Sequence, residues 1–166
     1  IVIQTRRRDL VVGTHGRSLW VLDDITPLSL LSPVIVNTPF HVFDPRPARP
    51  RYNNDYQGIW GDRMFFAPNP ALGARIDYWI RDYARDTVKI TIKDAHGHLV
   101  RKLDGSRDVG LNRVIWDLKA EKDQQLGNPH ELPEFVAPGT YEITVSFGDD
   151  HAGTVSVEVG APRAGT

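Results

Sequence analysis

Cysteine is missing from this chain of 166 residues, and methionine occurs once, at Met64. The absence of cysteine excludes disulfide bridges, thiolate zinc sites and cysteine nucleophiles. No apolar run is long enough to span a bilayer. The 20 Lys and Arg residues nearly balance the 21 Asp and Glu residues, which leaves a net charge of -1. Such a balance gives no overall attraction for nucleic acid or anionic membranes, so we expect neither as a partner.

Signatures of catalysis are also absent. The chain has no Gly-x-Ser-x-Gly elbow, phosphate loop or dinucleotide fingerprint. Glycosidases need two opposed carboxylates, but Asp77, Asp117 and Glu142 fall at outward positions of predicted strands, where a solvated or turn-capping role is favoured. The clusters 96–98 and 149–151 lie in predicted turns, which explain their His and Asp residues without a metal. We therefore predict no catalytic residue, no metal site and no cofactor.

From about residue 74 onward, apolar and polar side chains alternate. This alternation is typical of antiparallel strands that turn one face to a core. The composition, 40% hydrophobic and 25% charged, is ordinary for a globular domain. The sequence therefore predicts an all-β fold, an Ig-like antiparallel β-sandwich over residues 74–160, with Trp116 at the centre of a core that no disulfide crosses. The predicted inward residues are Ile76, Tyr78, Ile80, Val88, Ile90, Ile92, Val114, Trp116, Leu118, Tyr141, Ile143, Val145, Phe147, Val155, Val157 and Val159.

A β-hairpin is predicted before this region, from Asp9 to Asp23, with His15 and Gly16 as a two-residue turn. Apolar residues fall on both faces of the hairpin, and a lone hairpin cannot bury two faces. We therefore expect it to pair with another copy of the chain or to be mobile when alone. The two-residue turn places Leu10, Val12, Leu19 and Val21 on one face and Val11, Trp20 and Leu22 on the other.

Proline gathers in the segment 26–73, which is predicted to be an irregular connector because proline lacks the amide donor of helices and sheets. This segment also carries Tyr56 and Trp60, and Trp79 follows in the first predicted strand of the sandwich. These three aromatic residues are the candidate ligand-binding residues, since exposed aromatic rings can stack on sugars. Packing of the connector onto the sandwich is the favoured explanation for the aromatic residues of the connector.

Five stretches support a family resemblance. The string from Asp9 to Leu28, DLVVGTHGRSLWVLDDITPL, resembles the last blade strands of sortilin-like and BNR-repeat β-propeller proteins, often labelled glycosyl-hydrolase-like. The other stretches match the same proteins in order, and the last two, 110–117 and 138–141, also resemble the Ig-like domain of flagellar hook-capping proteins. The full set is 9–28, 43–48, 68–78 and 110–117 with 138–141.

The resemblance implies a division of the chain. Residues 1–25 would be a terminal propeller-blade hairpin, 26–73 a Pro-rich connector, 74–160 the Ig-like sandwich and 161–166 a flexible tail. It also implies an extracytoplasmic protein, either secreted or periplasmic. The chain opens in the middle of a pattern and contains no Asp-box and no complete blade, so we expect a fragment without the activity of the propeller.

The function expected from these observations is that of a non-catalytic C-terminal accessory or interaction module of such a propeller protein. Its expected partner is its own missing propeller domain, with protein or carbohydrate as further partners. One alternative is a carbohydrate-binding module, which requires Tyr56, Trp60 or Trp79 to be exposed in a coplanar row. The other is a fragment of a glycoside hydrolase-like enzyme whose active site lies in the missing propeller.

Overall fold

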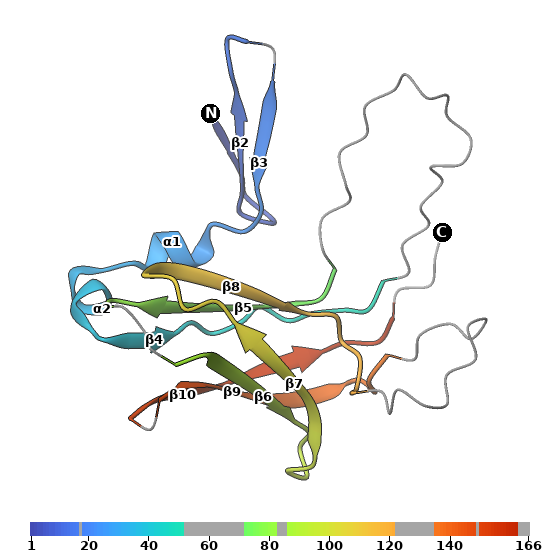
Figure 1. Ribbon diagram of the computed structural model, residues 1–166. Helices are drawn as coiled ribbons and strands as arrows, with labels where there is room; N and C mark the ends of the chain where they lie inside the picture. Colours follow the sequence, from blue (N-terminus) through green and yellow to red (C-terminus); the bar gives the residue numbers. More distant parts are fainter. Residues whose placement is uncertain (17, 52–71, 83–85, 122–134, 149, 163–166) are drawn as a thin grey trace, which may run out of the picture.

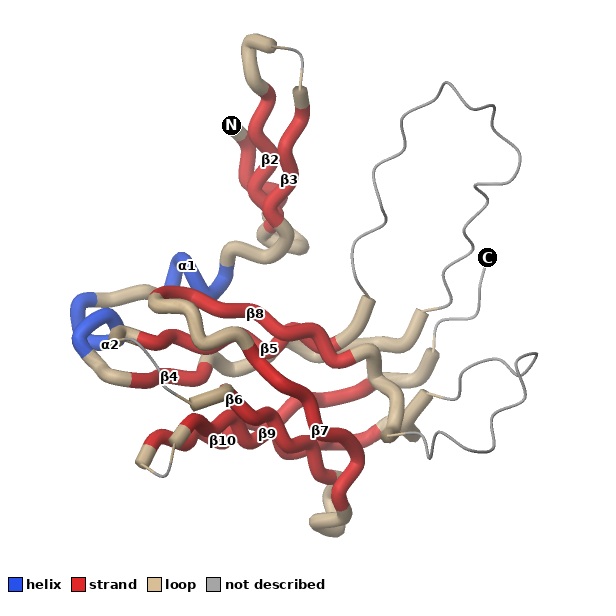
Figure 2. Tube along the Cα trace, in the orientation of Figure 1, coloured by secondary structure: helices blue, strands red, loops and turns tan. Residues whose placement is uncertain are grey.

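A computed structural model of the protein describes residues 1–16, 18–51, 72–82, 86–121, 135–148 and 150–162. It shows a β-sandwich from which a small three-stranded sheet projects (Figure 1). Within the described residues, helix is confined to two short segments that lie between that sheet and the first strand of the sandwich along the chain (Figure 2). The predicted all-β class is confirmed.

Among the described residues, two antiparallel sheets form the sandwich, and their seven strands are divided three and four as in an Ig-like fold. The first sheet has the order β4-β5-β8, with β4 (Phe40–Val42), β5 (Ala74–Ile80) and β8 (Gly110–Trp116). The second has the order β10-β9-β6-β7, with β10 (His151–Val159), β9 (Gly139–Phe147), β6 (Val88–Lys93) and β7 (Leu99–Gly105).

Trp116 lies at the centre of the core, as predicted, and is fully buried. Its indole N–H donates to the Lys119 carbonyl oxygen at 2.9 Å, so the buried donor is satisfied. The ring of Tyr141 meets it edge-on, with 5.3 Å between the centroids. The Tyr141 hydroxyl donates to the Ala137 carbonyl at 2.7 Å, the tyrosine-corner arrangement that Ig-like domains use at the start of this strand.

The segment 26–73, expected to be irregular, contributes a strand to the sandwich. The strand β4 pairs with β5, and Val42 packs into the core. Further along, the Ala48 amide donates to the Glu158 carbonyl at 2.9 Å and the Gly160 amide donates to the Ala48 carbonyl at 2.9 Å, so the Pro-rich stretch covers part of the outer edge of β10. The prolines of this segment are compatible with both contacts. The strand β4 contains no proline, and extended chain flanked by proline can lie along the edge of a sheet.

The projecting sheet consists of β1 (Val2–Gln4), β2 (Asp9–Gly13) and β3 (Leu19–Leu22), all antiparallel to their neighbours. The hairpin β2–β3 was predicted, whereas β1 was not. Two short helices follow, α1 (Thr26–Leu30) and α2 (Pro33–Asn37), and α1 lies at the base of the sheet above β8 (Figure 1). Residues 163–166 of the predicted tail lie outside the described part of the chain.

Candidate interaction surface

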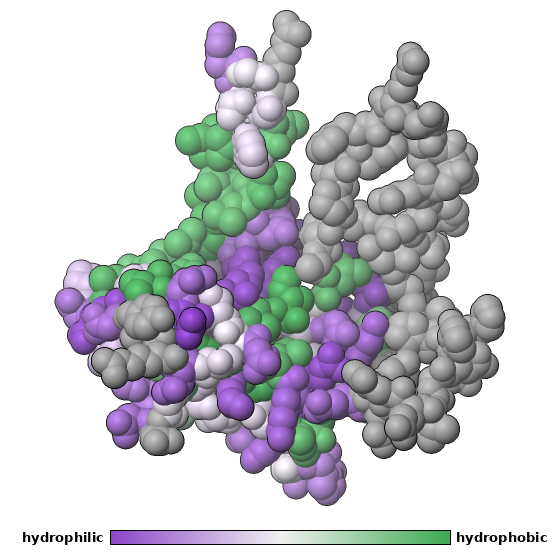
Figure 3. Space-filling view, viewed as in Figure 1, coloured by the Kyte–Doolittle hydropathy of each residue, from purple (hydrophilic) through white to green (hydrophobic). Residues whose placement is uncertain are grey.

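Apolar side chains remain exposed on the projecting sheet. On β3, Leu19 is 77% exposed, Trp20 67% and Val21 59%. On β1, Val2 and Ile3 are also more than half exposed. The space-filling view shows this hydrophobic surface rising from a sandwich whose visible described face is largely hydrophilic (Figure 3). An apolar surface of this kind is typical of an interaction site.

Both faces of the sheet are apolar, but their composition differs from the prediction. The Thr14 amide donates to the Ser18 carbonyl at 3.0 Å, so three residues rather than two separate the last hydrogen-bonded positions. One additional loop residue shifts the register by one and exchanges the faces of the second strand. The register therefore places Leu10, Val12, Trp20 and Leu22 on one face, together with Ile3, and Val11 and Val21 on the other, together with Val2.

Arg113 of β8 joins the base of this sheet to the sandwich. Its Nε donates to Oδ1 of Asp77 on β5 at 2.7 Å, and its Nη2 donates to Oδ2 at 3.2 Å. The same guanidinium donates to the carbonyl oxygens of Asp23 at 2.6 Å and Asp24 at 2.8 Å, directly after β3. The fixed fork of the guanidinium suits this two-pronged arrangement. One side chain thus connects three segments that are distant in the sequence.

Arg46 binds the base of the sheet from another side. Its guanidinium donates to the carbonyl oxygens of Arg6 at 3.1 Å and Arg7 at 2.9 Å, in the turn between β1 and β2. It also lies 3.7 Å from the carboxylate of Asp24, which is buried and has a positive φ of 49°. Asp tolerates this left-handed conformation better than most residues.

Asp77 corrects one expectation from the sequence. It does point away from the sandwich core, but it is only 6% exposed rather than solvated, because it pairs with Arg113 beneath the segment that follows β3. Burial raises the pKa of Asp77 above its usual value, and the hydrogen bond and charge of Arg113 oppose that rise. The other two carboxylates behave as expected: Glu142 is exposed, and Asp117 accepts the Lys119 amide at 3.2 Å in a turn.

The candidate sugar-binding residues are described only in part. Tyr56 and Trp60 lie outside the described residues. Trp79 is on the outer face of β5, where the register sets it between His41 and Leu111. Its side chain is partly covered, and its indole N–H is buried without a partner within the described part of the chain. The coplanar row that the carbohydrate-binding alternative requires therefore stays a prediction.

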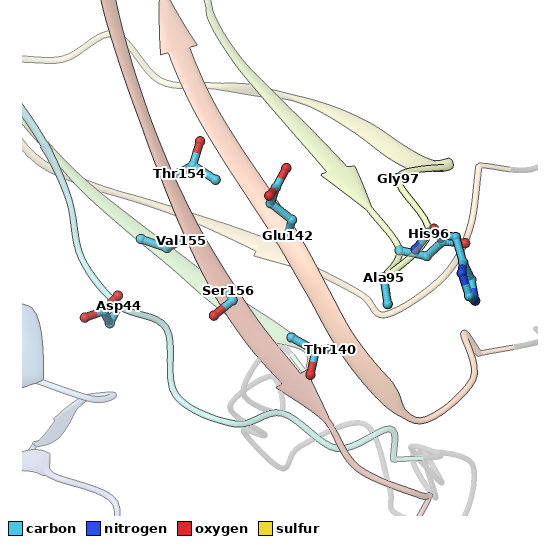
Figure 4. A pocket seen from close by; sticks show the side chains of 10 residues that line it. Asp44, Ala95, His96, Gly97, Thr140, Glu142, Thr154, Val155 and Ser156 are labelled. Atoms are coloured by element: carbon cyan, nitrogen blue, oxygen red, sulfur yellow. The ribbon is translucent and has the colours of Figure 1, made fainter.

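A shallow polar groove lies on the opposite sheet, between β9, β10 and the turn that joins β6 to β7 (Figure 4). The Asp94 carboxylate accepts the amides of His96 at 2.8 Å and His98 at 2.9 Å. Partial desolvation raises the pKa of Asp94, but these two bonds, together with the side-chain hydrogen bond and charge of His98, lower it below its usual value. Figure 4 shows the His96 ring pointing away from Glu142. Within the described residues, no three His, Asp or Glu side chains are grouped so as to hold a metal ion.

No protein-family model matches the chain, and a search of the curated proteins finds no match. Among the helices that the structure describes, none has the length and apolar character needed to cross a membrane. The interaction surface therefore has to be interpreted from its own residues.

Arg113 is the residue that sequence reasoning missed, since nothing local in the sequence distinguishes it from a solvated strand arginine.

Proposed function

We propose that this chain is a non-catalytic accessory module of an extracytoplasmic β-propeller protein, and that it binds its propeller through the sheet β1–β3. The observation that carries the proposal is the exposure of large apolar side chains on both faces of this sheet. A blade strand in a propeller is covered on both faces by neighbouring blades, and the string from Asp9 to Leu28 resembles such strands. The exposed residues are Ile1, Val2, Ile3, Leu19, Trp20, Val21 and Leu22.

The size of the sheet favours a propeller of the same polypeptide over a second copy of the chain. A strand spacing of about 4.8 Å and a rise of about 3.4 Å per residue give roughly 200 Å² for each face. Stacking one face on that of a second copy then buries only about 400 Å², well below the roughly 1,200 Å² of a stable interface. A domain that flanks the sheet covers both of its faces, which buries about twice the area that a second copy covers on one face.

The junction gives the module a means of holding its sandwich in one orientation. Arg113 and Arg46 bind backbone carbonyls on two sides of the base of the sheet, and Arg113 is itself paired with the buried Asp77. Because these contacts lie within the chain, they persist when the sheet is covered by a partner. A propeller that binds the sheet would therefore also position the sandwich, which is the role proposed for the module.

The test is binding to the segment encoded upstream of Ile1 in the same gene, produced as a separate polypeptide. We expect the two to form a one-to-one complex. We expect Trp20→Asp to weaken it by more than about tenfold, because buried aromatic residues carry much of the energy of an interface. Thr140→Asp is the matched control, since it adds the same charge at an exposed position of β9. A reading frame that starts near Ile1, or an upstream segment that does not bind, contradicts the proposal.

A further inference from the structure

Three consecutive arginines, Arg6, Arg7 and Arg8, lie in the turn between β1 and β2, and all three are exposed. The backbone of this turn is held on two sides. The Arg8 amide donates to the Gln4 carbonyl at 2.7 Å, and the Arg8 carbonyl accepts the Ile25 amide at 2.9 Å. These bonds keep Arg8 at a positive φ of 58°, a conformation that is unfavourable for arginine. The turn therefore presents its guanidinium groups from a fixed backbone.

A second group of arginines, from the Pro-rich segment, lies beside this turn. Arg46 donates to two carbonyl oxygens of the turn, across 39 and 40 residues of sequence. Arg49 and Arg51 follow and are exposed. A chain spans at most about 3.6 Å per residue, so these three arginines lie within roughly 18 Å of one another. The two groups together form what we call the arginine surface, which consists of Arg6, Arg7, Arg8, Arg46, Arg49 and Arg51.

The carboxylates near the arginine surface are engaged elsewhere in the chain. Asp24 is buried, and its amide is bound by the Asp9 carboxylate at 3.0 Å. Asp23 lies 3.7 Å from the guanidinium of Arg75. Asp44 lines the polar groove of the four-stranded sheet. Within the described part of the chain, no carboxylate forms a salt bridge with the first two arginines of the turn, so their charge is not neutralised.

We propose that the arginine surface binds an anionic polysaccharide. The planar fork of a guanidinium group matches an oxyanion that offers two oxygens, such as the carboxylate of a uronic acid or a sulfate ester. A polysaccharide repeats such groups along its length, and several arginines can therefore bind one polymer at once, which raises the overall affinity. This inference does not depend on the proposed function, because the arginine surface lies outside the apolar faces of the projecting sheet.

The shape of the molecule at this place favours a flexible polymer over other polyanions. The turn between β1 and β2 lies at the base of the sheet, where the sheet projects from the sandwich (Figure 1). Figure 3 shows hydrophilic surface at this base, directly below the apolar surface of the sheet. A lipid bilayer is flat and a DNA duplex is stiff over about 50 nm, so neither enters such a corner. A flexible polysaccharide chain can.

The test is binding of the full chain to two polymers, polygalacturonate, which carries carboxylates, and dextran sulfate, with neutral dextran as the reference. Isothermal titration calorimetry at about 50 mM salt measures the affinity. We expect binding to at least one charged polymer and none to dextran. The affinity should fall by about tenfold or more when salt is raised to about 500 mM, because salt screens exposed charges. A preference for one of the two polymers identifies the anionic group.

A pair of double variants locates the binding. Arg6→Ser combined with Arg7→Ser removes two exposed guanidinium groups and keeps the backbone carbonyls that Arg46 binds, so the fold should be retained. We expect it to weaken binding by about tenfold or more, because hydrogen bonds to charged groups are the strong ones. Lys89→Ser combined with Lys93→Ser is the matched control, since it removes the same charge from exposed positions of β6 and should leave the affinity unchanged.

Three results would overturn the inference. The first is that neither charged polymer binds. The second is that the arginine variant binds as tightly as the unchanged chain, or that the lysine variant loses as much. The third comes from two parallel probes, a DNA duplex and vesicles of phosphatidylcholine with phosphatidylserine. If either binds more tightly than both polymers and is weakened by the arginine variant, the partner of the arginine surface is nucleic acid or membrane instead.

Discussion

The sandwich and the projecting sheet use the same kinds of residue in opposite ways. Trp116 is fully buried and its N–H is paired, whereas Trp20 is 67% exposed. The sandwich buries its Val, Ile and Leu residues between two sheets, and the smaller sheet presents the same types to its surroundings. Burial is the main source of folding free energy, so stability resides in the sandwich. The projecting sheet instead leaves large apolar side chains exposed.

The largest expected effect tests the sandwich side of this comparison. Trp116→Ala should lower the free energy of unfolding by about 3–5 kcal/mol, because it removes the largest buried side chain and leaves a cavity. Denaturant unfolding followed by circular dichroism measures the change. An unaltered unfolding midpoint would show that the core does not depend on Trp116.

The next effect tests the junction between the two regions. Arg113→Ala leaves the Asp77 carboxylate buried without its partner, which costs about 2 kcal/mol at neutral pH, since the arginine side chain is 25% exposed. Arg81→Ala, which breaks the exposed pair with Asp82, should cost no more than about 1 kcal/mol.

The same variant has a pH dependence of defined sign. Burial raises the folded-state pKa of Asp77 above its usual value. The unfavourable contribution of Asp77 to stability is therefore absent below the unfolded-state pKa and appears as pH rises through the folded-state pKa. Without Arg113 the pKa should rise further. The loss caused by Arg113→Ala should therefore shrink when unfolding is measured at about pH 4. An equal loss at both pH values would mean that Asp77 is not left charged and buried.

The sequence predicts local alternation well and long-range pairing poorly. The strands of the sandwich are recognisable because each residue's face follows from its neighbours, as the burial of Trp116 shows. The strand β4 was missed because it has only three residues, lies between prolines, and forms only by pairing with the distant strand β5. The register of β2 and β3 was wrong by one, since the length of their loop decides it. The pair of Asp77 and Arg113 joins residues 36 positions apart, which no local pattern reveals.

A smaller effect, at alkaline pH, returns to the core. Burial, followed by the charge of Asp108, raises the pKa of Tyr78 to about 12 from 10.0. In the unfolded chain this hydroxyl ionises near pH 10, and in the folded chain it stays neutral and donates to the Ser106 carbonyl at 2.5 Å. Stability should therefore fall by about 1–2 kcal/mol as pH rises from about 10 to about 12.

Tyr78→Phe is the control for this titration. It should cost about 1 kcal/mol at pH 7, because the Ser106 carbonyl loses its donor. It should also flatten the alkaline loss of stability, since the group that titrates is gone. An alkaline loss equal to that of the unchanged chain would assign the effect to other groups.

The smallest expected effect is the one that separates the two regions most sharply. Trp20→Ser replaces a large aromatic side chain, yet it should change the free energy of unfolding of the chain by less than about 0.5 kcal/mol, because the ring is 67% exposed and outside the core. The same change should weaken binding to the upstream segment, where the ring becomes covered. Unfolding of both forms, measured beside Trp116→Ala, provides the comparison. A loss of stability at Trp20 approaching that at Trp116 would mean that the sheet belongs to the folded core, and that its apolar faces are not a docking surface.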